Sequence, residues 1–297
     1  MAAQRVALTR YAWLSIATAV LTIALKTWAY LLTGSVGLLS DAVESLVNLA
    51  GAVLALVMLG YAARPADEKH PYGHSKAEYF SSAFEGLLII FAACAIIIAA
   101  TLRLFHPKPL EQMDIGLVVS LIAALLNFAT ARILLRAGRQ YESITLEADG
   151  QHLMTDVWTS AGVVLGLVCA WLTGWLWLDA VIAILVGLNI IRIGWGFLRR
   201  SFDGLMDAVL PAEEVELIEK IMATYQERGI AFHALRTRRA ASKRFVSVHM
   251  LVPGEWTVHH AHCLAEEFEN RVRAQLKNTS LITHLESLED SRSFHHG

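Results

Sequence analysis

Two polar pairs with a spacing of four residues interrupt segments that are otherwise apolar enough to cross a membrane. The pairs are Glu44 with Asn48 and His152 with Asp156. A spacing of four places both members of a pair on one face of a helix, one turn apart. Because ionisable groups are costly inside a bilayer, such pairs indicate the pathway of a substrate or an ion. Carboxylate, amide and imidazole ligands from two facing helices suit a divalent transition-metal cation.

The first two thirds of the chain contain six candidate membrane spans. A mean hydropathy of +0.47 and a hydrophobic content of 55% exceed what an ordinary soluble domain shows. A helix needs about 20 apolar residues to cross roughly 30 Å of hydrocarbon. In the second span, the small residues Gly51, Ala52, Ala55 and Gly60 are expected to let neighbouring helices approach closely. The six expected spans are residues 11–33, 37–62, 80–103, 114–136, 152–173 and 177–198.

The distribution of basic residues predicts the orientation of these spans. An even number of spans places both termini on one side of the membrane. Lys and Arg gather at the N-terminus, after the sixth span and in the loops on that same side, whereas the opposite loops hold little more than Arg103 and Lys108. Because cytoplasmic loops carry the excess of Lys and Arg, both termini are expected in the cytoplasm.

After Asp207 the chain has the composition of a soluble domain. Pro211 and the acidic residues Glu213 and Glu214 begin an amphipathic helix, since both features favour a helix N-terminus. The expected order is a helix to about 228, strands 232–238 and 244–252, a helix over 258–276 and a strand over 280–286. The sequence therefore predicts an α-helical membrane protein with six transmembrane helices in residues 1–207, followed by a small cytoplasmic α+β domain, α-β-β-α-β, in residues 208–297.

The strand period sorts the histidines of this domain. His249 lies on one face of the second expected strand, and His284 and Glu286 share one face of the last. A carboxylate beside imidazoles on a sheet face can bind a zinc-like ion, and His233 and His262 could complete such a site. Each histidine taken singly is more often an ordinary surface residue, so the hypothesis depends on their joint placement.

A third cluster lies in the loop between the second and third spans. Asp67, His70 and His74 fall within eight residues, and Pro71 and Gly73 allow the chain to bend around one ion. The alternative is a polar loop whose histidines face water, and the spacing favours neither interpretation.

Three motifs together resemble those of a known family. They are Gly34-Ser-Val-Gly-Leu-Leu-Ser-Asp-Ala-Val-Glu44-Ser-Leu-Val-Asn48, the loop Arg64-Pro-Ala-Asp67 through Tyr72-Gly-His74-Ser-Lys76-Ala-Glu78, and His152-x-x-x-Asp156. The chain resembles the cation diffusion facilitator family over nearly its whole length, and more closely the bacterial branch that exports zinc and ferrous iron. The loop is the most specific part of this resemblance.

The resemblance implies a homodimeric secondary antiporter of the bacterial inner membrane, not an enzyme, that exports a divalent transition metal against inward proton flow. Zn2+ is the first expectation as substrate and as structural ligand; Fe2+, Mn2+, Co2+ and Cd2+ remain open, and no nucleic-acid partner is expected. The implied residues are Glu44, Asn48, His152 and Asp156 as transport site, Asp67, His70 and His74 as loop site, His233, His249, His262, His284 and Glu286 as dimer-stabilising cytoplasmic site, and Lys76 with Asp207 as a charge interlock of the dimer.

The first pair departs from the pattern of that branch. Two aspartates are usual where this chain has Glu44 and Asn48. The site therefore carries about two negative charges in place of three, because the Asn48 amide is neutral. Asp41 and Asp149, each one turn before a member of the site, are candidates for the missing charge; the alternative is that each is a polar residue at a helix entry near water.

Other functions remain to be weighed. A metal-dependent multi-pass membrane enzyme predicts an HExxH motif or several HxxxH boxes near one membrane face, and the dense run His259-His260-Ala-His262 lies in the soluble domain instead. A passive divalent-metal channel predicts repeated rings of ligands along a pore. The soluble domain could also act as a metal sensor that tunes transport through the dimer.

Overall fold

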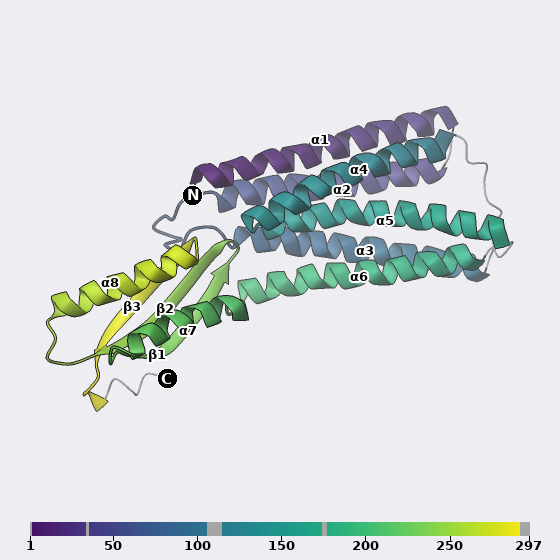
Figure 1. Ribbon diagram of the computed structural model, residues 1–297. Coiled ribbons are helices and arrows are strands. Elements are labelled where there is room, and N and C mark those ends of the chain that lie inside the picture. The colour runs from purple at the N-terminus through teal and green to yellow at the C-terminus, as the bar shows by residue number, and fades with distance from the viewer. Residues whose placement is uncertain (1, 34–35, 106–114, 174–176, 292–297) are drawn as a thin grey trace. The chain divides into compact units, whose positions relative to one another are not determined.

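The computed structural model describes residues 2–33, 36–105, 115–173 and 177–291. The chain divides into two compact units, residues 1–202 and residues 203–297. The described elements of the first unit are helices, and those of the second are helices and strands (Figure 1).

The described residues of the first unit form six long helices. They are α1 (Ala2–Thr33), α2 (Val36–Ala62), α3 (Ala77–Phe105), α4 (Ile115–Tyr141), α5 (Ile144–Thr173) and α6 (Trp177–Leu205). Among the described residues, every one of these helices except α5 contains a stretch long and apolar enough to span a membrane. The predicted six-helix architecture is confirmed. Helix α5 begins eight residues before the span expected from residue 152, because Glu147 and Asp149 in its first turns lower the local hydropathy.

Small residues bring the helices of this unit together. Helix α1 packs along α2, α4 packs along α5, and α3 contacts both α2 and α5. A Cβ on Gly51 would lie 2.4 Å from Oε1 of Glu85 on α3, so the predicted close approach at Gly51 is confirmed. The same prediction is wrong for Gly60 within this chain, because no described atom lies within 4 Å of its Cβ position.

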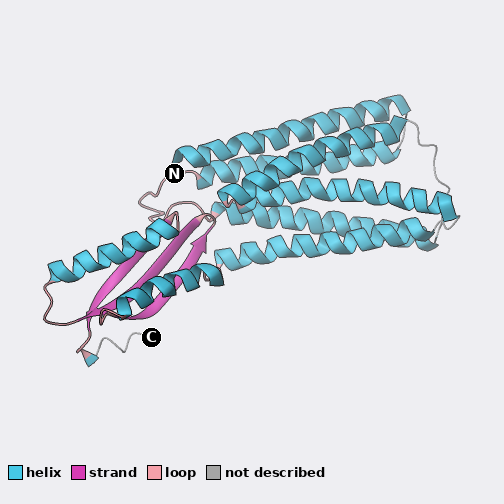
Figure 2. Cartoon of the chain, viewed as in Figure 1, coloured by secondary structure: helices cyan, strands magenta, loops and turns pink. Residues whose placement is uncertain are grey.

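The second unit is an α-β-β-α-β domain, as predicted. It contains α7 (Ala212–Gln226), β1 (Ala231–Ala240), β2 (Lys243–Val252), α8 (Val258–Gln275) and β3 (Thr279–Ser287). The strands lie in the order β1-β2-β3; β1 and β2 are antiparallel, and β2 and β3 are parallel. Helix α8 makes the crossover that a parallel pair requires. Both helices cover one face of the sheet (Figure 2), and a core that includes Tyr225, Met250 and Phe268 fills the space between the layers.

A bulge in β1 sorts its side chains in a way that strict alternation does not. The pairing with β2 shifts between His233 and Arg236, and Ala234 has a positive φ of 50°. Phe232 and Leu235, three residues apart, both pack against the core. His233 therefore stays on the opposite face of the sheet, paired with His249 on β2.

Candidate metal sites

A buried polar cluster joins α2, α4 and α5 within the membrane unit. Nδ2 of Asn48 donates a hydrogen bond of 2.5 Å to Oδ2 of Asp156, and Nδ2 of Asn127 donates one of 3.0 Å to the same oxygen. Asn48 and Asn127 are 6% and 3% exposed. The structure thus brings together one member of each sequence pair, and it adds an asparagine from a third helix.

His152 belongs to a second contact, with a residue that the sequence motifs did not include. Its Nδ1 lies 2.5 Å from Oε2 of Glu85 on α3, and both side chains are buried. An ionised carboxylate accepts hydrogen bonds only, so Nδ1 is the donor. The other ring nitrogen, Nε2, then remains as the lone-pair nitrogen that can bind a metal ion.

A third acidic residue lies one turn before His152 on α5. Asp149 is 3% exposed, and its Oδ1 accepts a hydrogen bond of 3.0 Å from Ser15 on α1. The Asp149 carboxylate also interacts electrostatically with Glu85 and with His152. Of the two residues proposed to supply a missing charge, Asp149 therefore lies near the predicted site, whereas the side chain of Asp41 lies outside the described residues.

Glu44 differs from the other members of the predicted transport site. In this single chain its side chain is exposed, whereas Asn48, one turn further along α2, is buried. Hydrogen bonds join Asn48 to Asp156 and His152 to Glu85. The ligand role of all four predicted residues stays a prediction.

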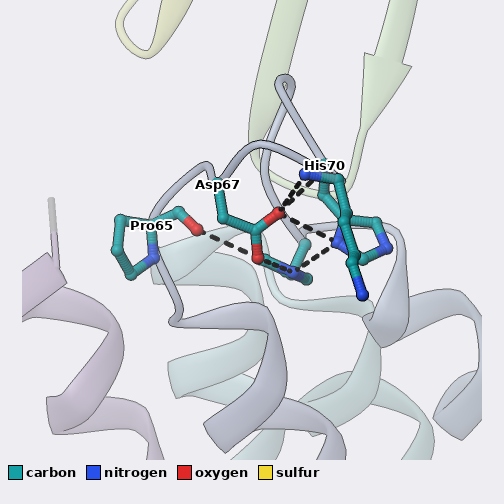
Figure 3. A network of polar contacts seen from close by, with 5 residues as sticks. Pro65, Asp67 and His70 are labelled. Atoms are coloured by element: carbon teal, nitrogen blue, oxygen red, sulfur yellow. Dashed lines mark hydrogen bonds and ion pairs between the residues drawn. The ribbon is translucent and has the colours of Figure 1, made fainter.

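The loop between α2 and α3 folds into a compact cluster around Asp67 (Figure 3). Oδ1 of Asp67 accepts hydrogen bonds from the backbone nitrogens of Lys69 and His70, at 3.0 and 2.7 Å. Oδ2 of the same carboxylate lies 3.3 Å from Nε2 of His74. Nε2 of His74 also lies 3.1 Å from Nδ1 of His70. The carboxylate and the two imidazoles each place a ligand atom within 4.8 Å of the others.

The surroundings prepare this loop cluster for a cation. Nδ1 of His74 lies 3.2 Å from the carbonyl oxygen of Pro65, which directs Nε2 toward Asp67. The hydrogen bond from the backbone of His70 holds the pKa of Asp67 below its usual value. Asp67 is therefore ionised at neutral pH, and the geometry agrees with the predicted three-ligand set.

A second three-ligand group lies on the helix-free face of the sheet. Glu286 is its centre: Oε2 lies 2.7 Å from Nε2 of His233, and Oε1 lies 3.0 Å from Nδ1 of His249. The His249 ring is not oriented for a hydrogen bond to that oxygen, although the distance is short. His284 lies at the edge of the group, with Nε2 3.6 Å from Oε1 of Glu286.

The three histidines shift the titration of the central carboxylate. Burial raises the pKa of Glu286, but the hydrogen bond from His233 and the nearby imidazoles lower it by a larger amount, so the net pKa lies below the usual value.

The bulged strand β1 and the parallel pair β2–β3 place four of the five predicted cytoplasmic ligands together, namely His233, His249, His284 and Glu286.

Three predicted residues lie apart from these groups. His262 is on α8, which covers the other face of the sheet, and its Nε2 lies 3.7 Å from Oε1 of Glu266. Lys76 belongs to the first unit and Asp207 to the second, where Oδ1 of Asp207 accepts a 2.9 Å hydrogen bond from Arg238. The roles assigned to all three from the resemblance stay predictions.

The sequence motifs do not include Glu85, Asn127 or Ser15. Each lies in an expected span without a carboxylate, amide or imidazole side chain four positions before or after it. The cost of a buried ionisable group would have singled out Glu85, because it lies within the third span. No comparable signal exists for Asn127 or Ser15, since neutral polar residues are tolerated in helix contacts.

Comparison with known proteins identifies both units. Residues 12–206 match the family profile described as the cation efflux transmembrane domain, and residues 210–288 match that of the cation efflux protein cytoplasmic domain, named ZT_dimer. A Synechocystis protein, named as the uncharacterised transporter sll1263, is 49% identical over 286 residues, which cover 96% of this chain and 92% of that protein. The cation-efflux pump FieF of Shewanella oneidensis is 30% identical over 275 residues, covering 93% and 92%.

Two solved structures of CzrB match part of the chain. A structure of CzrB in a zinc form is 35% identical and covers 28% of this chain and 97% of the solved chain, with a TM-score of 0.25. A second CzrB structure is 36% identical and covers 26% and 96%, with a TM-score of 0.24.

Proposed function

The chain belongs to the cation efflux family, the cation diffusion facilitators, and from this premise we propose that it exports divalent transition-metal ions in exchange for protons. It is a multi-pass integral membrane protein and a cation efflux transporter. The alternative of a metal-dependent membrane enzyme is wrong, because members of this family transport their metal. We propose the identity of the transported metal, its exchange for protons, and the orientation of the chain in the membrane.

The observation that carries the proposal is the buried contact between α2 and α5 inside the bundle. Asn48 and Asp156 meet at 2.5 Å, and His152 lies on the same face of α5 one turn away. The amide oxygen of Asn48 is buried without a hydrogen-bond donor among the described residues. A buried acceptor oxygen costs free energy unless it is paired, and a metal cation satisfies that need.

Zinc is the metal that the ligand set favours. Imidazole nitrogen with carboxylate oxygen is a common donor set for Zn2+, and Fe2+, Mn2+, Co2+ and Cd2+ can use the same atoms with other preferences. The neutral Asn48 oxygen moves this preference toward harder ions, relative to a site with one more carboxylate. We expect zinc transport with a metal order that depends on residue 48.

Competition at His152 supplies the coupling to protons. A histidine binds metal only through an unprotonated nitrogen, so metal and proton exclude each other at Nε2. Protons arriving from the far side would release the ion, and loss of those protons to the cytoplasm would restore the site. Rocking of the helices about the site would provide alternating access.

The second unit is proposed to hold two copies of the chain together on the cytoplasmic side. The name of its family profile indicates dimerisation, and the basic residues around the termini support a cytoplasmic location in the bacterial inner membrane. Metal bound by His233, His249 and Glu286 would favour one arrangement of the two domains. The loop cluster at Asp67 would bind a further ion.

Metal-driven proton flux in proteoliposomes tests the proposal. Zinc, iron(II), manganese, cobalt and cadmium are compared for wild type, Asp156→Ala and Asn48→Asp, with the exposed Asn189→Asp on α6 as a matched control for added charge. We expect proton flux with zinc, loss of flux in Asp156→Ala, and a changed metal order in Asn48→Asp alone. Normal flux in Asp156→Ala would move the transport site elsewhere, and absence of proton flux during metal uptake would exclude antiport.

A further inference from the structure

We propose that Glu85 is a functional member of the transport site, where it orients His152 and supplies the carboxylate charge that Asn48 lacks. This inference depends on the proposed function, because it concerns the same site. Glu85 lies on α3, outside the motifs on α2 and α5. Its role would make three helices, not two, the source of the charge that binds the metal.

The contact with His152 gives Glu85 its orienting role. The carboxylate is 1% exposed and holds Nδ1 of His152 at 2.5 Å from Oε2. Carboxylates that accept the second ring N–H of a metal-binding histidine fix its tautomer and ring orientation, and they increase the basicity of the ligand nitrogen. Glu85 thereby leaves Nε2 of His152 as the nitrogen that binds the ion.

The position of Glu85 beside α2 connects it with Asn48. Gly51 lies three residues after Asn48 and so on the same face of α2. The Cβ position of Gly51 is 2.4 Å from Oε1 of Glu85 and 3.1 Å from Oε2. The Glu85 carboxylate therefore occupies the space that a side chain at residue 51 would fill, one helical turn from the neutral amide of Asn48.

Buried acceptor oxygens mark this region as a place for a cation. Among the described residues, Oε1 of Glu85, Oδ2 of Asp149 and the amide oxygens of Asn48 and Asn127 are buried without a hydrogen-bond donor. All four of these residues contact His152 or Asp156: Asn48 and Asn127 hydrogen-bond to Asp156, Glu85 contacts His152, and Asp149 interacts with His152 through charge. Since unpaired buried oxygens are destabilising, a divalent cation is the ligand that their arrangement favours.

The charge count leads to the same conclusion. Of the two predicted pairs, Asp156 brings a carboxylate to the buried contact between α2 and α5, whereas Glu44 is exposed and the amide of Asn48 is neutral. Glu85 adds a buried carboxylate in contact with His152, beside Asp149 one turn before that histidine. The charge lost from α2 at residue 48 is thus recovered from α3 at residue 85.

Metal affinity of the purified full-length protein tests this role independently of transport. We measure zinc binding by isothermal titration calorimetry in detergent for wild type, Glu85→Gln and Glu78→Gln. Glu78 is the matched control: it is a buried glutamate on the same helix, and its carboxylate accepts a hydrogen bond from Ser143. We expect the membrane-site dissociation constant to rise about 10- to 100-fold in Glu85→Gln, the range found for lost carboxylate partners of ligand histidines, and to stay unchanged in Glu78→Gln.

A rescue experiment separates the charge role from a general structural role. The double variant Glu85→Gln with Asn48→Asp returns a carboxylate to α2 but not the hydrogen-bond partner of His152, so it should recover part of the lost zinc affinity and bind at least about threefold more tightly than Glu85→Gln, or about 0.6 kcal/mol. A Glu85 that only stabilises packing would not be rescued from another helix. If Glu85→Gln does not fold, the double variant decides, because it must fold and bind zinc if residue 48 replaces the missing charge.

The outcomes distinguish this inference from the proposed function. If wild type transports zinc and Asp156→Ala does not, yet Glu85→Gln binds and transports like wild type, the role of Glu85 is refuted and the transporter remains. If Glu85→Gln loses affinity and the double variant binds zinc no better than Glu85→Gln, the proposed supply of charge by Glu85 is refuted. Absence of zinc binding at the membrane site of wild type would refute the zinc site itself.

Discussion

Gly51→Ala is the substitution that most directly tests the geometry around Glu85. A Cβ at residue 51 would lie 2.4 Å from Oε1 and 3.0 Å from Cδ of that carboxylate. The Glu85 carboxylate is the flexible end of the side chain, so it can move, but its Oε2 is held by Nδ1 of His152. The added methyl group therefore acts on the contact between Glu85 and His152 without altering either residue.

The size of the effect follows from the distances. To reach an ordinary contact distance, the carboxylate must retreat by about 1 Å, which stretches a 2.5 Å hydrogen bond beyond the usual limit. Loss of a hydrogen bond to a charged group costs about 1.5–3 kcal/mol, while Gly to Ala in a helix gains about 0.8–1 kcal/mol. We expect a net loss of about 0.5–2 kcal/mol in the free energy of unfolding, together with a zinc affinity about tenfold lower.

Gly60→Ala on the same helix is the matched control. No described atom lies within 4 Å of its Cβ position, so only the gain in helix propensity remains. The two variants should therefore differ by about 1.5–3 kcal/mol, or about 3–10 °C in Tm for a chain of this size. Thermal unfolding in detergent gives the difference in stability, and calorimetric titration with zinc gives the difference in affinity.

Equal behaviour of the two alanine variants would refute the reasoning. A Gly51→Ala protein as stable as Gly60→Ala would show that α2 and α3 do not approach closely at this level. A destabilised Gly51→Ala with unchanged zinc affinity would show that the Glu85 contact maintains packing but does not prepare His152.

Three further predictions concern the sheet and the loop. Ala234→Gly should stabilise the second unit by about 0.5–1 kcal/mol in thermal unfolding, because Ala234 has φ 50°, whereas Ala223→Gly in exposed α7 should destabilise it by a similar amount. Because the pKa of Glu286 is lowered in the folded protein, its ionised form stabilises the fold above about pH 4.5. This contribution to stability disappears as the pH falls through the lower pKa of the folded state. Acid unfolding followed by Trp fluorescence should therefore depend less steeply on pH in Glu286→Gln than in wild type. Asp67→Asn should weaken zinc binding by the loop about 10- to 100-fold, because it removes the carboxylate oxygen 3.3 Å from Nε2 of His74, and Glu68→Gln in the same calorimetric titration should not.

Elements whose signal is local were predictable from the sequence. The apolar length of the spans and the alternation of the strands gave the six helices and the α-β-β-α-β order, because each depends on neighbouring residues. The start of α5 was missed, since Glu147 and Asp149 look like loop residues when hydropathy is averaged. The bulge at Ala234 was missed because an alanine with positive φ carries no sequence signal, unlike a glycine.

The candidate sites also differ in whether they depend on a local sequence signal or on the packing of separate helices. The loop cluster was predictable, because Asp67, His70 and His74 lie in one short segment that can close on itself. The contacts of Glu85 and Asn127 were not predictable, because they depend on how separate helices are rotated about their axes and shifted along them. A spacing rule within one helix identifies a face, but the partner of that face is set by packing.

One arrangement recurs at the intramembrane and the loop histidine clusters and determines how each should respond to substitution. An oxygen that is not a proposed metal ligand holds one ring nitrogen: Glu85 holds Nδ1 of His152, and the Pro65 carbonyl holds Nδ1 of His74. Such an oxygen orients the other nitrogen and reduces the conformational entropy that metal binding must remove. The backbone carbonyl of Pro65 cannot be removed by a side-chain substitution, so the orientation of His74 should tolerate substitution of its neighbours. The orientation of His152 should be more sensitive, since it depends on the Glu85 carboxylate and on Gly51, which leaves room for that carboxylate.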